Sequence, residues 1–289
     1  MPRNYELPAE FLDAADRFVA LANEVGESRA PDWVRTVLMY AAARYNAYSW
    51  LTGDHDGWDI AVHYASSRDD ALETVRLVEA AGRRAVAINR DLAVEAGVRS
   101  LLAECTHELG EVTCIVNNAS VFEYDDASTF AADTLAHTMR TNVAAPVLLA
   151  YGLHASLAED DRGVVINLLD QKLWNPNPDF LSYTLSKAAL KEATVLLAQA
   201  LAPRVRVVGI APGVTLPSTL QTEAGFAAAH AATPLRRSSQ PEDIAAAAVF
   251  LASAPAITGT TLLVDGGQHL LGSARDVMFV TEPTPVPLP

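Results

Sequence analysis

The stretch GVVINLLDQKLWNPNPDFLSYTLSKAALKEATVLLAQALAPRVRVVGIAPG, residues 163–213, decides the fold of this chain. It begins with the apolar run GVVINLL (163–169) and ends with a second one, VRVVGIAPG (205–213). Between them, hydrophobic residues at helical spacing predict a long helix over about 181–201. Two apolar strands joined by a helix form a parallel unit, because only a crossover connection of this length can bring the second strand beside the first in the same direction.

The same alternation extends on both sides of this unit, from about Gly57 onward. It predicts strands over 58–64, 84–92, 112–120 and 261–267, and helices over 68–82, 98–110, 131–158 and 241–253. Near-continuous apolar strands interleaved with helices are typical of a parallel sheet covered on both faces. We therefore predict an α/β fold, a doubly wound parallel sheet of the Rossmann-like kind, over residues 56–271. Such a sheet binds its ligand at the carboxyl ends of the strands.

The two ends of the chain have a different pattern. Apolar residues at helical spacing predict one helix that ends at Gly26 and a second that starts at Pro31 and ends before Gly53. Residues 1–55 are therefore predicted to form an atypical N-terminal helical hairpin. Residues 272–289 finish in the proline-rich sequence TEPTPVPLP and are predicted to be an extended tail.

Composition and charge exclude several classes of protein. The formal net charge of -14 disfavours binding to nucleic acids or to an anionic membrane surface. The longest apolar stretches are too short to span a bilayer, and the N-terminus does not have the pattern of a secretory signal. We see no His, Cys and carboxylate cluster with metal-ligand spacing, so no metal site is predicted. A soluble, cytoplasmic protein is expected.

The sharpest local pattern is SYTLSKAAL, in which Tyr183 and Lys187 are four residues apart on the predicted helix. Residues at this spacing project from the same face. An ammonium beside a buried tyrosine favours the phenolate, which would bring the tyrosine pKa toward working pH and let the phenol exchange a proton with a reacting group. The alternative is a surface lysine beside a tyrosine that only packs in the core.

Polar residues end three of the predicted parallel strands, where a ligand would lie. NNAS (117–120) ends one strand, Asp170 follows the next, and APG (211–213) ends the third. Asn142 lies within a predicted helix, where asparagine is unfavourable on propensity alone. We therefore expect its side chain to bond to a helix carbonyl or to a water.

With these motifs, residues from about 57 to 271 resemble the short-chain dehydrogenase/reductase family. The resemblance rests on DL (91–92), NNAS, TN (141–142), YTLSK, APG and TGTTLLVDGG in this order. It implies an oxidoreductase in which Tyr183 is the proton donor. Lys187 would lower the pKa of this tyrosine and bind the nicotinamide ribose, and Asn142 would hold a proton-relay water.

One departure from the family pattern narrows the resemblance. Most members have a catalytic serine thirteen residues before the tyrosine, where this chain has Asp170. With Phe122, this resembles the pteridine reductase branch, including dihydromonapterin reductase-like members. In that branch the aspartate works with the tyrosine, the phenylalanine stacks on the pterin, and Ser120 and Thr215 would line the same pocket. As alternatives, Asp170 caps a helix or loop, and Phe122 only packs in the core.

The end of the second family strand bears on the choice of cofactor. Enzymes that use NAD place a carboxylate there for the ribose hydroxyl, whereas this chain has HYASSR, with no carboxylate before Asp69. Hydroxyls and an arginine suit a 2′-phosphate, so NADP(H) is the expected cofactor. The residues expected to contact it are His63, Tyr64, Ser66, Ser67, Asp91, Leu92, Asn118, Ala119, Ser120, Lys187, Pro212, Gly213 and Thr215.

The family's glycine-rich phosphate loop is missing from its usual place. The stretch RTVLMYAAARYNAYSWLTGD (35–54) has no glycine before Gly53. Without glycine the backbone approaches a pyrophosphate poorly, so weak or lost cofactor binding is an open alternative. Residues from about 5 to 52 resemble instead a small helical bacterial family of unknown function. A helical segment would then replace the first strand–helix unit, and the central strand would be absent or supplied by Val34–Tyr40.

Two functions remain open from the sequence. The first is an NADPH-dependent reductase, impaired or not by the missing glycines, that acts on a pterin- or folate-like substrate. The second is a catalytically inactive, reductase-shaped binding or interaction module. The resemblance also implies a homodimer or homotetramer built through the helices at about 131–158 and 181–201.

Overall fold

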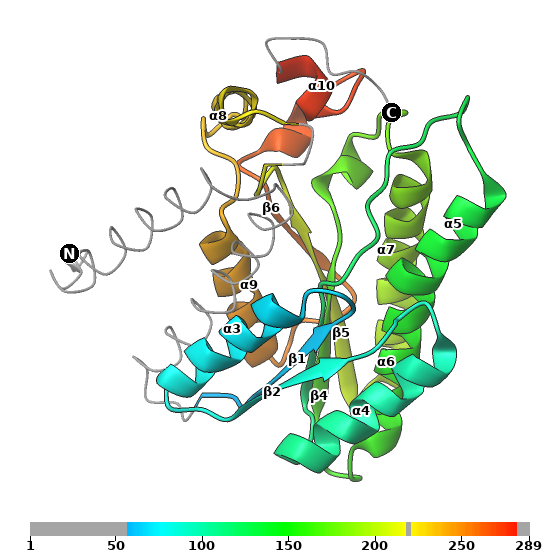
Figure 1. The fold of residues 1–289 in the computed structure, drawn as a ribbon, viewed down its shortest axis with the longest axis vertical. Helices are drawn as coiled ribbons and strands as arrows, with labels where there is room; N and C mark the ends of the chain where they lie inside the picture. Colours follow the sequence, from blue (N-terminus) through cyan, green and yellow to red (C-terminus); the bar gives the residue numbers. More distant parts are fainter. Residues whose placement is uncertain (1–56, 218–220, 282–289) are drawn as a thin grey trace, which may run out of the picture.

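The computed structural model of the chain describes residues 57–217 and 221–281. Within these residues, parallel strands alternate with helices along the sequence (Figure 1). The strands are β1 (Ile60–Tyr64), β2 (Ala85–Asn89), β3 (Cys114–Asn117), β4 (Gly163–Leu168), β5 (Val205–Pro212) and β6 (Thr261–Val264). The α-helices are α3 (Arg68–Ala80), α4 (Glu95–Leu109), α5 (Ala132–Met139), α6 (Ala145–Ser156), α7 (Leu181–Leu201), α8 (Glu223–Ala231), α9 (Pro241–Ser253) and α10 (Val277–Thr281). Three short helices of other types are η1 (Arg140–Ala144), η2 (Gln171–Trp174) and η3 (Gln268–Leu270).

The strands form two parallel sheets. β1 pairs with β2, and the second sheet has the order β3-β4-β5-β6. Among the described residues, β1 pairs only with β2, and β3 pairs only with β4, so each of these two strands has one edge without a described partner strand. This break lies where we expected the central strand to be absent or replaced. The Val34–Tyr40 segment, the predicted hairpin (1–55) and the glycine-poor stretch (35–54) fall outside the described residues.

Helices cover both faces of the larger sheet, which confirms the predicted Rossmann-like α/β fold (Figure 1). In β4, which is buried along its whole length, Val164 and Ile166 pack toward α9 while Val165 packs toward α6 and α7. This alternation follows from the two-residue period of a strand. Because both faces are covered by helices, inward- and outward-facing positions are both apolar, and the strand has the continuous hydrophobic run from which we predicted it.

A third hydrophobic cluster ties the two sheets together. Ile88 from β2 and Ile115 from β3 pack with Val98 and Leu101 of α4 and with Leu149 of α6. Ala61 of β1 joins the same cluster. The α4–α6 layer therefore holds both sheets, although no described strand pairs them directly.

A buried polar ladder crosses the sheet to α7. The amide of Asn117 donates to Asn167 Oδ1 at 2.8 Å, and Asn167 Nδ2 donates to Thr194 Oγ1 at 2.9 Å. Asn167 is 0% exposed, so each group depends on its protein partner. The ladder fixes α7, which carries Tyr183 and Lys187, against the strand that leads to Asp170.

Several elements differ from the prediction. The strands at 84–92, 112–120 and 261–267 are shorter than expected, and the helix at 131–158 contains a π-helical turn, η1. α8 and α10 were not predicted. α10 lies within the predicted extended tail 272–289, so that prediction is wrong for residues 277–281, where apolar side chains pack on the rest of the domain.

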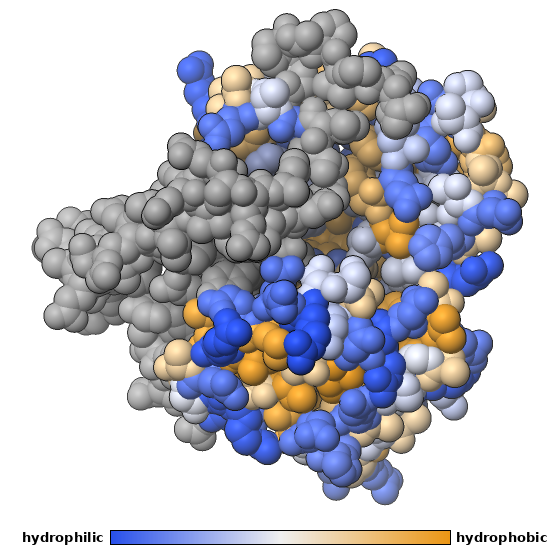
Figure 2. Space-filling view, in the orientation of Figure 1, coloured by the Kyte–Doolittle hydropathy of each residue, from blue (hydrophilic) through white to orange (hydrophobic). Residues whose placement is uncertain are grey.

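The surface gives no sign of a membrane-spanning element in the described part of the chain. None of the helices described is long and apolar enough to cross a bilayer. In the view of Figure 2, hydrophilic residues alternate with apolar ones over the region of α3, β2 and α4.

We expect Asn167→Ala to lower the free energy of unfolding by about 1–3 kcal/mol, because it leaves the buried Asn117 amide and Thr194 hydroxyl without this partner. Urea denaturation followed by circular dichroism measures the change. Asn89→Ala, at an exposed strand residue, is the control and should cost clearly less. Equal losses for the two variants would contradict a structural role of the ladder.

Candidate active site

The site is built where β4 ends and α7 begins. Asp170 follows β4 and caps the 3-10 helix η2, accepting a hydrogen bond from the Lys172 N–H to its Oδ1 at 2.8 Å. Its second oxygen, Oδ2, accepts a hydrogen bond from the Tyr183 hydroxyl at 2.9 Å. The loop-cap alternative and the pairing with the tyrosine therefore both hold for Asp170. One oxygen fixes the loop and the other faces the phenol.

Lys187 lies one turn after Tyr183 on the same face of α7, as the spacing predicted. Its ammonium is buried, donates to the Leu168 carbonyl at 2.7 Å and lies 5.7 Å from the centroid of the Tyr183 ring. The alternative of a surface lysine beside a packing tyrosine is therefore wrong.

Burial governs the protonation of all three groups. It raises the pKa of the Asp170 carboxyl, against hydrogen bonds from Lys172 N–H and Tyr183 that lower it. It also raises the pKa of Tyr183 well above its ordinary value, and the negative charge of Asp170 raises it further. Burial lowers the pKa of Lys187 to about 8, with Asp170 acting in the opposite direction.

The pKa of Tyr183 is raised overall in this structure, and the expectation that Lys187 lowers it stays a prediction. The phenol donates its proton to a carboxylate, and desolvation penalises the phenolate. The Tyr183 phenol and the Asp170 carboxyl both have raised pKa values and are joined by a hydrogen bond. The Lys187 ammonium lies beside them.

Asn142 holds the loop after β3. It lies in the π-helical turn η1 and is 1% exposed. Its Oδ1 accepts from the Val121 N–H at 2.8 Å, and its Nδ2 donates to the Val121 carbonyl and to Ser186 Oγ, each at 3.0 Å. Of the two expected partners, a helix carbonyl is not bound, and the water stays a prediction. The side chain instead joins the NNASV loop to the helix of Tyr183.

Asp125 was not predicted and holds the start of α7. Its buried carboxylate accepts hydrogen bonds from the N–H and the hydroxyl of Ser182, and its carbonyl accepts from the Leu181 N–H. A negative charge at a helix N-terminus is favourable. No local motif signals this residue, because its side-chain partner, Ser182, lies 57 positions away along the chain.

Aromatic side chains surround the Tyr183 ring. Phe122 stacks on Phe180 with the ring centroids 4.3 Å apart and meets Tyr183 edge-on at 4.7 Å. Tyr124 and Phe279 extend the cluster around Phe180. Phe122 remains 37% exposed, so it is not only a core residue. A partly exposed aromatic side chain beside a phenol suits a flat ring.

The residues expected to bind the cofactor follow the ends of several strands. His63 and Tyr64 end β1, and His63 Nε2 lies 2.8 Å from the Arg90 carbonyl. Ser66 and Ser67 are exposed at the start of α3. Asp91 accepts the Ala93 N–H, and Leu92 packs in the α4 cluster. After β3 come Asn118, Ala119 and Ser120, whose hydroxyl donates to the Val121 carbonyl.

Pro212 and Gly213 follow at the end of β5. A Cβ on Gly213 would lie 2.8 Å from Asp265 Cα, which explains the glycine of the APG motif. Thr215 Oγ1 donates to the Gly213 carbonyl and lies 2.7 Å from Ser239 Oγ.

The described residues that follow β1 fit the adenosine end of NADP(H). Ser66, Ser67 and Arg68 are exposed together, with no carboxylate before Asp69, which suits a 2′-phosphate. Residues 35–54, which stand where the family has its phosphate loop, lie outside the described ranges.

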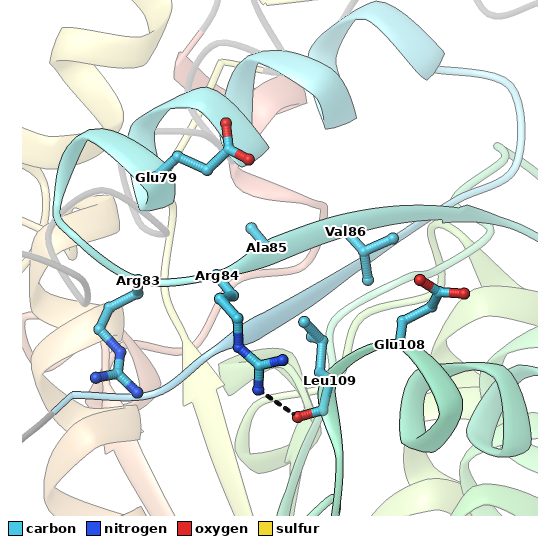
Figure 3. Close-up of a pocket in the computed structure, with 7 residues that line it drawn as sticks. All are labelled: Glu79, Arg83, Arg84, Ala85, Val86, Glu108 and Leu109. Carbon is cyan, nitrogen blue, oxygen red and sulfur yellow. Dashed lines mark hydrogen bonds between the residues drawn. The ribbon is translucent and has the colours of Figure 1, made fainter.

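Neither a metal centre nor the cavity in Figure 3 competes with this site. No group of three or more metal-ligating side chains occurs among the described residues. The cavity, of about 370 Å³, is lined by residues of α3, β2, α4 and the connection between α3 and β2, and these include Glu79, Arg83, Arg84 and Glu108. It lies at the start of β2, and none of the predicted site residues lines it.

The Asp170–Lys187 coupling leads to a measurable pKa change. Asp170→Asn removes the negative charge that raises the Lys187 pKa, so we expect this pKa to fall below about 8. The chain has three lysines, so ¹³Cε NMR titration with Lys187→Met to assign the signal measures it. Asp160→Asn, at an exposed position, should leave the value unchanged. An unchanged or higher Lys187 pKa in Asp170→Asn would contradict the coupling.

Comparison with known proteins supports the same family. The family model described as Enoyl-(Acyl carrier protein) reductase matches residues 53–269. A second model, described as a protein of unknown function, matches residues 11–74 and confirms the expected N-terminal resemblance. An uncharacterised oxidoreductase of Mycobacterium tuberculosis is 38% identical over 216 residues, 72% of this chain and 81% of the relative. A 3beta-hydroxysteroid dehydrogenase of Eggerthella lenta is 33% identical over 223 residues, 74% and 85% of the two chains.

Solved structures agree. The FolM alternative dihydrofolate reductase 1 of Brucella canis, complexed with NADP, has a TM-score of 0.72 and 34% identity over 80% of this chain and 89% of its own. A blue fluorescent protein from a metagenomic library, in complex with NADPH, has a TM-score of 0.69 and 30% identity over 79% and 93%. With the YxxxK pair, the strand-end motifs and the parallel sheet in place, these matches show that the chain belongs to the short-chain dehydrogenase/reductase family of oxidoreductases.

Proposed function

We propose that this chain is an NADPH-dependent reductase that acts on a pterin- or folate-like ring. The observation that carries the proposal is the buried hydrogen bond from Tyr183 to Asp170, with the half-open Phe122 ring beside it. A carboxyl that stays protonated more readily than usual, bonded to a phenol, can resupply a proton that the phenol gives away.

The residues of the site have separate roles in this reaction. Bound NADPH would supply a hydride for an electrophilic carbon of the substrate. Tyr183 donates its hydroxyl proton to the adjacent nitrogen or oxygen, and Asp170, when protonated, returns a proton to the tyrosine. The Lys187 ammonium opposes the negative charge that develops on the phenolate. Phe122 would stack on the substrate ring and hold it in the plane that this transfer needs.

Two lines support NADP(H) as the cofactor. The FolM and blue fluorescent proteins of similar structure were crystallised with NADP and NADPH. In this chain, the exposed Ser66, Ser67 and Arg68 provide hydroxyls and a positive charge where the 2′-phosphate would lie.

Asp170 supports a pterin-like substrate. Its place thirteen residues before Tyr183 is that of the aspartate in the pteridine reductase branch, and the similar FolM structures are described as alternative dihydrofolate reductases. A reductase for simple ketones or aldehydes remains the alternative substrate class. The turnover comparison below separates them.

A second function is favoured by one observation, the absence of any glycine between Arg35 and Tyr48. If the chain cannot hold a pyrophosphate, it is an inactive binding or interaction module with a reductase shape. A cytoplasmic location stays a prediction.

Titration of the purified protein with NADPH and NADH, followed by nicotinamide fluorescence, tests cofactor binding first. We expect micromolar affinity for NADPH and weaker binding of NADH. Absence of NADPH binding up to millimolar concentration would overturn the reductase proposal and favour the inactive module.

Turnover tests the proton donor and the substrate class. With dihydropterin or dihydrofolate, Tyr183→Phe should lower kcat by about 10²–10⁴-fold while NADPH binding is kept, since only the proton transfer is lost. Tyr151→Phe, at an exposed tyrosine of α6, is the matched control. Turnover of a simple aldehyde but of neither ring substrate would contradict the pterin assignment.

We also propose a homodimer or homotetramer that uses α6 and α7. Exposed apolar side chains, Tyr151 on α6 and Leu185 and Leu196 on α7, support this surface. Light scattering after size-exclusion chromatography should give two or four times 30.8 kDa, and Leu196→Glu should lower the mass toward one chain. A monomeric unsubstituted protein would contradict the assembly.

A further inference from the structure

An ion cluster with two buried members, Lys172 and Asp179, lies near the Asp170–Tyr183 pair. Two of its members, Lys172 and Asp179, lie between Asp170 and Tyr183 in the sequence, and the other two, Arg275 and Asp276, come from the C-terminal segment. We call this cluster the C-terminal clamp. The Lys172 ammonium donates to the Asp179 carbonyl at 2.5 Å and lies 3.2 Å from Asp276 Oδ2. Its side chain is 4% exposed, so both contacts stabilise a charge that burial would otherwise penalise.

Asp179 anchors the C-terminal segment. Its buried carboxylate accepts from Arg275 Nε on both oxygens, at 3.0 and 2.9 Å, and from the Asp276 N–H at 2.6 Å. Burial opposes ionisation of Asp179, but these hydrogen bonds and the Arg275 charge outweigh it and lower the Asp179 pKa. Contacts of this kind are short and charge-assisted, and they fix residues 275–276 against the loop before α7.

The loop held in this way carries the catalytic pair at its two ends. Asp170 starts it, and Tyr183 lies in the first turn of the helix that follows. Just before that helix, Phe180 has φ 55° and ψ 55°, a left-handed conformation that is rare for a bulky residue. Lys172 Nζ lies 5.3 Å from the Phe180 ring centroid, and Phe279 stacks on the same ring at 6.2 Å.

The C-terminal segment also packs on the tyrosine itself. Met278, in α10, is buried in one cluster with Phe180 and Tyr183. The segment 273–281, which the sequence predicted to be part of an extended tail, thus forms a wall of the site.

The clamp places two opposite charges near Asp170. The backbone N–H of Lys172 binds Asp170 Oδ1. The Lys172 ammonium favours the ionised form of Asp170, whereas the negative charge of Asp276 disfavours it. The other groups that face Asp170 are the Tyr183 hydroxyl and the Lys187 ammonium. Removing either member of the Lys172–Asp276 pair would leave the other's charge uncompensated.

We propose that residues 273–281 are part of the active site, and that Lys172 and Asp276 are positioning residues that hold the Asp170–Tyr183 pair and balance the charge beside it. The effect on turnover rests on the proposed reductase function. The effect on Asp170 itself does not, because the clamp is present in the chain without substrate.

The test uses the opposite signs of the two charges. In the full-length, cofactor-free protein, ¹³C NMR of aspartate carboxyls follows the Asp170 titration, with Asp170→Asn to assign the signal. Lys172→Met should move the midpoint up by roughly one pH unit and Asp276→Asn should move it down, since a nearby charge commonly shifts a carboxyl by this amount. The double variant should return close to the unsubstituted midpoint.

Matched controls separate this from a general loss of structure. Lys172→Arg keeps the charge and should shift the midpoint less than Lys172→Met. Arg99→Gln removes an exposed ion pair on α4 and should shift nothing. Shifts in the same direction for Lys172→Met and Asp276→Asn, or no shift in either, would overturn the proposal. Asp276 is partly exposed and its replacement is isosteric, so this arm remains informative if Lys172→Met does not fold.

Turnover distinguishes failure of the clamp from failure of the proposed function. If the unsubstituted protein reduces a dihydropterin, the pH–rate limb set by Asp170 should move in the same opposite directions in the two variants. If the protein neither binds NADPH nor turns over, the proposed function fails, while the NMR titration still decides the role of the clamp.

Discussion

The hydrogen bond from the Tyr183 hydroxyl to Asp170 joins the end of β4 to the first turn of α7, and much of the described structure serves to keep it in place. Asn167 ties β4 to α7 below the pair, and Asp125 fixes the N-terminus of α7. Asn142 holds the loop that carries Phe122. Asn167, Asp125 and Asn142 are each buried, so their polar groups are costly to leave unpaired, and together they hold the elements that carry the phenol and its neighbours.

Burial also sets the chemistry of the pair. In water an aspartate is ionised at neutral pH and a tyrosine is neutral. The carboxylate of such a pair would therefore hold no proton to pass to the phenol. Within the protein, desolvation raises both pKa values, the charge of Lys172 lowers that of Asp170, and the charge of Asp276 raises both. The family motif identifies Tyr183 and Lys187, but their burial and the nearby charges decide how readily the proton moves.

The described sheet is divided at the position where the family has its central strand and phosphate loop. The two parts are held by the α4–α6 layer, through a hydrophobic cluster that includes residues of β1, β2 and β3. The proposed catalytic pair, Asp170 and Tyr183, lies in the four-stranded part, and the exposed serines expected at the adenosine end follow β1 in the other. Cofactor binding therefore depends on how both parts are placed, whereas the proton-transfer geometry depends on one.

The sequence alone predicted the six described strands in their order, and α7 and α9 begin and end at the predicted residues. It could do so because strand and helix periods are local properties of the chain, and because Tyr183 and Lys187 are one helical turn apart. It did not reveal α10, the contacts of Asn142 and Asp125, or the raised Tyr183 pKa. Only the tertiary structure decided these, because they arise from burial and from partners tens of residues away, such as the 97 positions between Asp179 and Asp276. Such contacts leave no periodic pattern in the sequence.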